Sequence, residues 1–165
     1  MPFADKFRAM MDMPLPGEML GKMTVESVDV GHVGRGDGHY AYPVRLVLRG
    51  AGGQAAVRRA LKPLLATRRT TFSGYGTPYQ LWFGRSEIES LGDGRYRVSV
   101  EGAGVRVHLE SDLARFCQHV AGQGLLSVAP EDQDALVAGY IEQYQGDVRR
   151  LVGRYRTRLR KSESG

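Results

Sequence analysis

Few residues of this chain have the types and the spacing that catalysis needs. Glu87 and Glu89 share one face of an expected strand and have the spacing of an acid/base pair. No second catalytic group accompanies them. Cys117 lies on the apolar stripe of an expected helix, which favours a buried and unreactive thiol. The sequence therefore favours a protein that is not an enzyme, although it leaves any reaction open.

The histidines give only a weak indication of a metal site. His32 and His39 flank one glycine-rich loop, but no cysteine lies near them to complete a zinc site. Cys117 and His119 are two residues apart on an expected helix, so their side chains point to different sides. We therefore expect neither a bound metal nor a cofactor.

A glycine motif between an expected strand and an expected helix raises the question of a dinucleotide. Residues 50–55 read Gly-Ala-Gly-Gly-Gln-Ala and match the pattern G-x-G-x-x-A. The acidic residue that should follow about 20 positions later is missing, since residues 68–71 read Arg-Arg-Thr-Thr. The strands that follow have the pattern of an antiparallel meander. The motif therefore predicts a plain glycine-rich loop, with a general anion site near Arg58 left open.

Basic residues gather at the C-terminal end of the chain. Residues 149–161 hold seven cations and no acid, whereas the chain outside residues 149–165 has 16 basic and 17 acidic residues. Cations at the end of a helix interact favourably with its dipole, but seven exceed what this effect needs. An acidic partner should therefore be attracted to this end. The predicted site consists of Arg149, Arg150, Arg154, Arg156, Arg158, Arg160 and Lys161.

A second candidate surface comes from residues 95–110, where two runs alternate apolar and polar side chains. A two-residue turn at Gly102-Ala103 would pair the runs as a hairpin with all apolar residues on one face. The other face would carry Arg97, Arg106 and His108, which could hold a single-stranded nucleic acid. Because acidic residues share that face, an ordinary solvated sheet surface is the alternative.

The remaining elements follow from periodicity and from turn residues. We expect a helix over 3–12, a hairpin of strands 23–33 and 40–48, and strands over 70–76 and 79–91 with a bulge at 84–86. Helices are expected over 54–66, from Ser111 and from Ala129. Pro63 should kink its helix or end it near Leu61. Pro43 has no amide donor, so we expect its strand to lie at a sheet edge, or the backbone nitrogen of Pro43 to point away from a neighbouring strand.

The last helix carries a heptad-like apolar seam. Its members are Val137, Ile141, Tyr144, Val148, Leu151 and Tyr155. The seam predicts packing on the rest of the chain or pairing between two copies. Gly139, Gly146 and Gly153 recur every seven residues and indicate a bare ridge against which another backbone could pack.

Together these patterns predict an α+β fold with an antiparallel sheet of about five or six strands. Helices cover one face, and a helix-grip arrangement around the long last helix is the variant. The expected parts are an N-terminal helix and Pro-rich lead-in (1–21), the core (22–128) and the last helix (129–165). A single cysteine, no secretory signal and no long apolar run favour a cytoplasmic protein outside the membrane.

The function that these observations favour is a small non-enzymatic module that binds an acidic partner, nucleic acid first, through its basic last helix. A homo-oligomeric structural or adaptor protein that pairs through the seam is one alternative. A helix-grip protein that binds a small apolar ligand is the other.

Overall fold

A computed structural model describes residues 3–72, 77–107 and 130–164. The elements in chain order are α1 (Phe3–Met10), β1 (Met19–Leu20), β2 (Met23–Val30), β3 (Val33–Gly34), β4 (His39–Arg49), α2 (Gly53–Leu65), β5 (Arg69–Phe72), β6 (Pro78–Gly92), β7 (Arg95–Arg106) and α4 (Pro130–Ser164). The helix expected from Ser111, which includes Cys117 and His119, lies outside the described residues.

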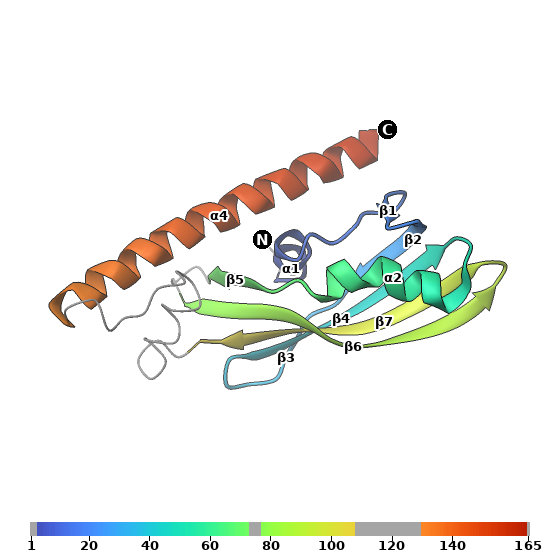
Figure 1. Ribbon diagram of the computed structural model, residues 1–165. Helices are drawn as coiled ribbons and strands as arrows, with labels where there is room; N and C mark the ends of the chain where they lie inside the picture. Colours follow the sequence, from blue (N-terminus) through green and yellow to red (C-terminus); the bar gives the residue numbers. More distant parts are fainter. Residues whose placement is uncertain (1–2, 73–76, 108–129, 165) are drawn as a thin grey trace.

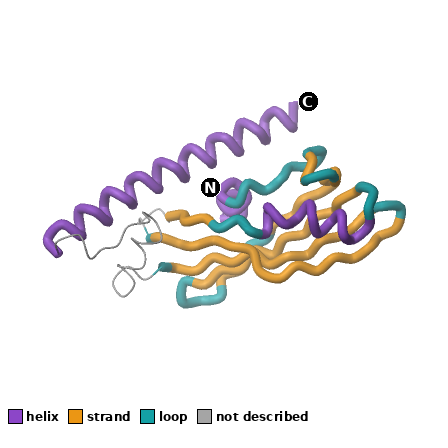
Figure 2. The backbone as a smooth tube through the Cα atoms, in the orientation of Figure 1, coloured by secondary structure: helices purple, strands orange, loops and turns teal. Residues whose placement is uncertain are grey.

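The predicted α+β class is confirmed. The strands form one curled antiparallel sheet in the order β1-β2-β4-β7-β6-β5, and β3 pairs with β4. Helices α1 and α2 lie on the same side of this sheet, and α4 runs as a long rod beyond α1 (Figure 1). The tube in Figure 2 shows the opposite side of the sheet without a helix among the described residues.

The predicted hairpin turn at Gly102-Ala103 is wrong. Strand β7 runs without interruption from Arg95 to Arg106 and pairs with β4 on one side and β6 on the other. The alternation predicted for the first of the two runs is correct, since Val98 and Val100 are buried. The true turn precedes the strand at Asp93-Gly94, where both residues have positive φ.

The requirement for glycine at position 102 comes from a close contact with the N-terminal helix α1. A Cβ atom added at Gly102 would lie 2.3 Å from Cζ of Phe7, and one at Gly104 would lie 3.1 Å from Leu81. These glycines therefore leave room for side chains that pack on the inner face of the sheet. Glycine in a strand often marks such a close approach rather than a turn.

Most of the other strand predictions agree with the structure, although residues 73–76 of the strand expected over 70–76 lie outside the described residues. Strands β2 and β4 pair as expected, and the register of β6 shifts between Phe83 and Ser86, where the bulge was expected. Pro43 lies within an interior strand, so the edge explanation is wrong. Its carbonyl accepts a hydrogen bond from Gly31 at 2.8 Å, just beyond the last paired residues of β2. The nitrogen of Pro43, which has no N–H to donate, thus faces the end of the β2–β4 ladder.

Helix α2 shows what the glycine motif does. Gly52 and Gly53 have φ values of 103° and 68°, which glycine adopts without strain, and they start the helix. The helix continues through Pro63 to Leu65, close to the expected bounds of 54–66, so Pro63 does not end it near Leu61, which was one of the two outcomes expected. No parallel strand pairs occur in the described sheet, so the motif has no dinucleotide-binding context.

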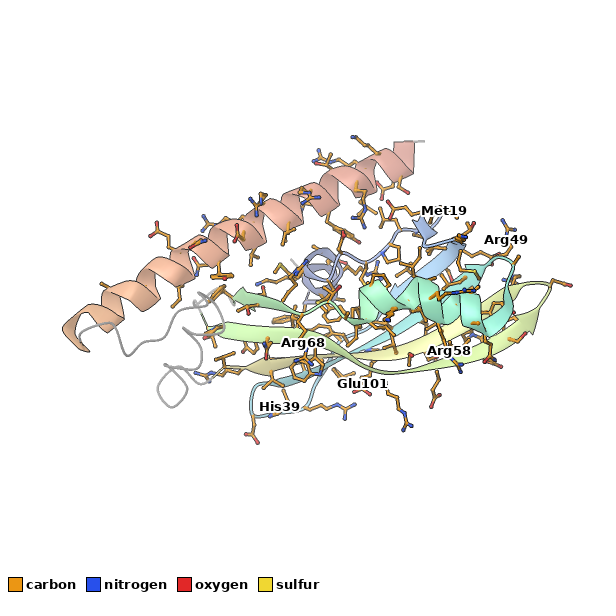
Figure 3. All side chains as sticks on the ribbon, in the orientation of Figure 1. Met19, His39, Arg49, Arg58, Arg68 and Glu101 are labelled. Carbon is orange, nitrogen blue, oxygen red and sulfur yellow. The ribbon has the colours of Figure 1, made fainter. Side chains whose placement is uncertain are left out.

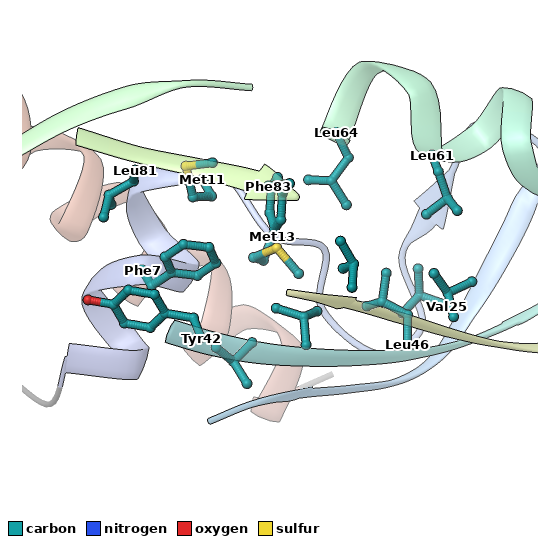
Figure 4. Packing of buried hydrophobic residues seen from close by; sticks show 14 of the residues in the cluster. Phe7, Met11, Met13, Val25, Tyr42, Leu46, Leu61, Leu64, Leu81 and Phe83 are labelled. Carbon is teal, nitrogen blue, oxygen red and sulfur yellow. The ribbon is translucent and has the colours of Figure 1, made fainter. Parts of the chain in front are cut away.

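The core fills the inner face of the sheet with side chains from the N-terminal segment and α2. Phe7, Met11 and Met13 are at most 1% exposed and lie over the valines and leucines of the strands (Figure 4). Because this segment occupies the inner face, α4 packs on α1 and β5 instead of crossing the sheet. The helix-grip variant is therefore not the arrangement seen.

Candidate nucleic-acid interface

Helix α4 turns its apolar seam towards its own chain. Val148 and Tyr155 are buried, and Ile141, Tyr144 and Leu151 are partly buried against the core. Tyr155 packs on Ala9 and Leu15 of the N-terminal segment. The side chain of Val137 lies outside the described part. Pairing between two copies stays a prediction, but it would require the seam to leave these contacts.

Arg158 fixes the same side of α4 to the N-terminal segment. Its Nη1 lies 2.8 Å from a carboxylate oxygen of Asp12, and its Nε lies 3.2 Å from one of Glu18. Its Nη2 also donates a hydrogen bond to the carbonyl of Met13. Predicted as a contact for an acidic partner, this guanidinium is instead engaged within the chain.

Replacing Arg158 by methionine should destabilise the protein by about 1–3 kcal/mol, because two carboxylates and a carbonyl lose a charged donor. The apolar stem is kept, so the loss reports the guanidinium rather than packing. Chemical denaturation measures it. Arg156→Met is the matched control, since Arg156 is exposed and should change stability by at most about 0.5 kcal/mol.

The outward side of α4 carries the other predicted cations. Arg149, Arg150, Arg154, Arg156, Arg160 and Lys161 are all exposed. Arg150 lies 3.0 Å from Asp147, but Arg149, Arg154, Arg156 and Arg160 contact no acid among the described residues. Figure 3 shows side chains projecting from the side of α4 that faces away from the sheet. The helix therefore presents a basic surface to solvent while its other side is held on the body.

Two arginines that sequence reasoning did not select extend this surface. A cleft of about 360 Å³ between α4 and β5 is lined by Arg68, Arg69, Arg150 and Asp147, among others. Arg68, labelled in Figure 3, and Arg69 are both exposed. Their signal in the sequence is an adjacent basic pair at the start of a strand, but only the fold brings it beside α4.

The glycine ridge of α4 lies on the outward side, and no backbone of the described chain packs on it. Cβ atoms added at Gly139, Gly146 and Gly153 would meet nothing within 4 Å. Gly146→Ala and Gly153→Ala should each stabilise the helix by roughly 1 kcal/mol, because alanine has the higher helix propensity. Thermal unfolding of the two variants tests this, and Gly52→Ala is the opposite control, since its φ of 103° strains alanine.

The second candidate surface does not form as predicted. Because β7 has no turn, Arg97 and Arg106 are nine positions apart on one strand and point to opposite faces. Arg97 lies 3.1 Å from Glu89 in an exposed ion pair. His108 lies outside the described residues. These residues therefore do not make one cationic face.

The helix-free face of the sheet carries mixed charge. A shallow depression of about 560 Å³ beside the β6 bulge is lined by Arg45, Arg85, Glu87 and Glu101, among others. Arg35 lies 2.9 Å from Glu101, and Arg95 lies 2.9 Å from Glu26. Cations and carboxylates alternate here, so this face lacks the uniform sign that attracts a polyanion.

An aromatic cluster joins α1 to the end of the sheet that carries β3. The ring of Phe7 stacks on Tyr42 at 4.3 Å between centroids, and Phe3 stacks on His32 at 4.7 Å. Burial raises the pKa of Tyr42 to about 12, with neighbouring Tyr40 and Tyr79 adding to the effect. Burial and a hydrogen bond to Tyr40 also raise the pKa of Tyr79.

The raised pKa of Tyr42 predicts a pH dependence of stability. Unfolding restores a pKa near 10, so the unfolded chain loses a proton that the folded chain keeps up to about 12. The contribution is present below pH 10 and is lost as the pH rises towards 12. Denaturation curves over this range should show falling stability, and Tyr42→Phe should make the fall shallower. Equal slopes in both proteins would contradict this cause.

Comparisons with protein families, curated proteins and solved structures find no match to the chain. Within residues 3–72, 77–107 and 130–164, no three histidine, cysteine or acidic side chains cluster as metal ligands would. No helix of the described chain has both the length and the apolar character needed to cross a bilayer.

Proposed function

We propose that this protein is a non-enzymatic cytoplasmic module that binds nucleic acid through the outward face of α4. The observation that carries the proposal is the exposed cation row from Arg149 to Lys161, fixed on the body by a buried opposite side. Because this helix is already held on the body, binding has to order only the arginine side chains and not the helix backbone. This lowers the entropy that a partner must overcome.

The dimensions of the row suit a phosphate backbone. Arg149 and Arg160 are eleven residues apart on the helix, which corresponds to roughly 16 Å at 1.5 Å per residue. One strand of a nucleic acid carries a phosphate about every 3.4 Å of helix axis, so the row spans about five nucleotides. Arginine forks also suit phosphate better than lysine does, and six of the seven cations are arginine.

The cleft beside α4 supports a path for the partner. Arg68 and Arg69 line it from the body side, and Arg150 lines it from the helix. A nucleic-acid strand bound on the outward face of α4 could thus continue towards β5 with cations on both sides.

Fluorescence anisotropy with a labelled oligonucleotide, single-stranded and duplex, tests the proposal at low salt. We expect binding to at least one form, with affinity that falls steeply as salt is added. A labelled polyglutamate peptide separates the nucleic acid from an acidic protein partner and should bind more weakly than the oligonucleotide. No binding of either nucleic-acid form at low salt would refute the proposal.

A further inference from the structure

The cleft between α4 and β5 combines apolar and aromatic side chains with cations. Its volume is about 360 Å³, at the lower end of the range of roughly 300–1,000 Å³ that is typical of pockets for small molecules. Met10 of α1 is buried, and Tyr144 and Leu151 of α4 are half-buried where they line the cleft. Arg68 and Arg69 line it from exposed positions. The cleft therefore offers apolar contact inside and positive charge at its opening.

The charges in the cleft favour an anion. Arg150 lies 3.0 Å from Asp147, which also lines the cleft, but Arg68 and Arg69 pair with no acid of the described chain. Nη1 of Arg69 donates a hydrogen bond to the carbonyl of Arg68 at 3.3 Å, which leaves donors of both guanidinium groups for a ligand. A guanidinium fork matches two oxygens of a phosphate, so this pair of arginines suits a phosphate group.

Tyr144 adds an aromatic surface beside these cations. Its ring lies 6.3 Å from the ring of Phe72, between centroids, and this contact supports it from the body side. Because Tyr144 is only half-buried, part of the side chain is open to the cleft that it lines. Bases of every kind stack on aromatic side chains, and arginines in the same groove hold the phosphates. The cleft thus has both groups that an unpaired nucleotide needs.

We infer that the cleft takes one unpaired base with its phosphate, so that the nucleic acid bound by this protein is single-stranded. The inference rests on the proposed function, because Arg150 belongs both to the cation row of α4 and to the cleft. Phosphate contacts alone favour a duplex, which carries more charge per length than a single strand. A duplex, however, must unpair and unstack a base before that base enters the cleft, whereas a single strand has its bases free.

Fluorescence anisotropy at low salt tests the inference with three labelled probes of equal length. The probes are a thymidine strand, an abasic strand that keeps every phosphate but lacks the bases, and a duplex. The thymidine strand should bind about fivefold or more tightly than the abasic strand, because stacking is lost without bases. It should also bind more tightly than the duplex. Equal affinities for the thymidine and abasic strands would overturn the inference.

Tyr144→Leu separates stacking from a structural role. Leucine keeps an apolar side chain in the seam of α4 but removes the aromatic ring. The variant should bind the thymidine strand severalfold more weakly and the abasic strand unchanged, whereas a merely structural effect would weaken both alike and overturn the inference. Tyr96→Leu is the matched control, because Tyr96 is also half-buried but lies on β7 outside the cleft, and it should leave both affinities unchanged.

Arg68→Gln combined with Arg69→Gln keeps the test valid if Tyr144→Leu unfolds. This change should weaken binding of the thymidine strand severalfold and binding of the duplex less, because the duplex stays outside the cleft. Arg58→Gln combined with Arg59→Gln removes an exposed adjacent pair on α2 and should have a much smaller effect on the thymidine strand. Equal losses from the two pairs would overturn the cleft assignment and leave the proposed function standing. Absence of binding to all three probes would overturn both.

Discussion

Replacing Phe7 by alanine should destabilise the protein by about 3–5 kcal/mol, which is the usual cost of removing a buried aromatic side chain. The side chain is 1% exposed and stacks on Tyr42, and the ring of Phe83 meets its edge at 5.5 Å. Its loss would open the contact between α1 and the sheet. Equilibrium denaturation measures the change in unfolding free energy.

Phe3→Ala is the matched control on the same helix. Phe3 is 53% exposed, so its removal should cost less than about 1 kcal/mol. Equal losses at the two positions would show that Phe7 is not buried as described.

A double-mutant cycle with Gly102 tests the specific contact. Gly102→Ala should destabilise the wild-type protein by about 1–3 kcal/mol, because its Cβ would lie 2.3 Å from Phe7. In the Phe7→Ala background the same change should cost much less, since the clash is gone. Additive losses would mean that Gly102 is not explained by Phe7.

The second large effect concerns the basic face of α4. Replacing Arg149, Arg154, Arg156 and Arg160 together by glutamine should lower the affinity for an oligonucleotide on the order of 100-fold at low salt. These four side chains are exposed and contact no acid of the described chain, so folding should be unaffected. Anisotropy titration measures the affinity, and circular dichroism checks the fold.

A variant of the mixed-charge sheet face controls for net charge. Arg45→Gln combined with Arg85→Gln removes two exposed cations far from α4 in the sequence. The loss of affinity in this variant should be much smaller per cation removed than in the α4 variant. A loss per cation as large as that of the α4 variant would show that overall charge, and not the face of α4, attracts the partner.

The sequence predicted the fold class and most of its elements because local patterns determine them. Alternation located β4 and the bulge of β6, and the seam of α4 identified the side that is buried. The turn within β7 was misplaced because two glycines resemble turn residues. Their actual cause is Phe7 and the side chains around Leu81, which are distant in the chain and leave no local signal.

The candidate site was predictable only in part for a related reason. All seven cations between Arg149 and Lys161 look alike in the sequence, yet Arg158 is engaged by Asp12 and Glu18. Arg68 and Arg69 join the surface only because β5 lies beside α4. Charge composition identified the region, but tertiary contacts decide which side chains remain available.

The salt dependence of binding tests the central claim most directly. The slope of log affinity against log salt concentration counts the phosphates that cations neutralise. We predict a steep negative slope for the wild-type chain and a slope shallower by about four for the variant with glutamine at Arg149, Arg154, Arg156 and Arg160. Equal slopes for the two proteins would contradict the assignment of nucleic-acid binding to this face of α4.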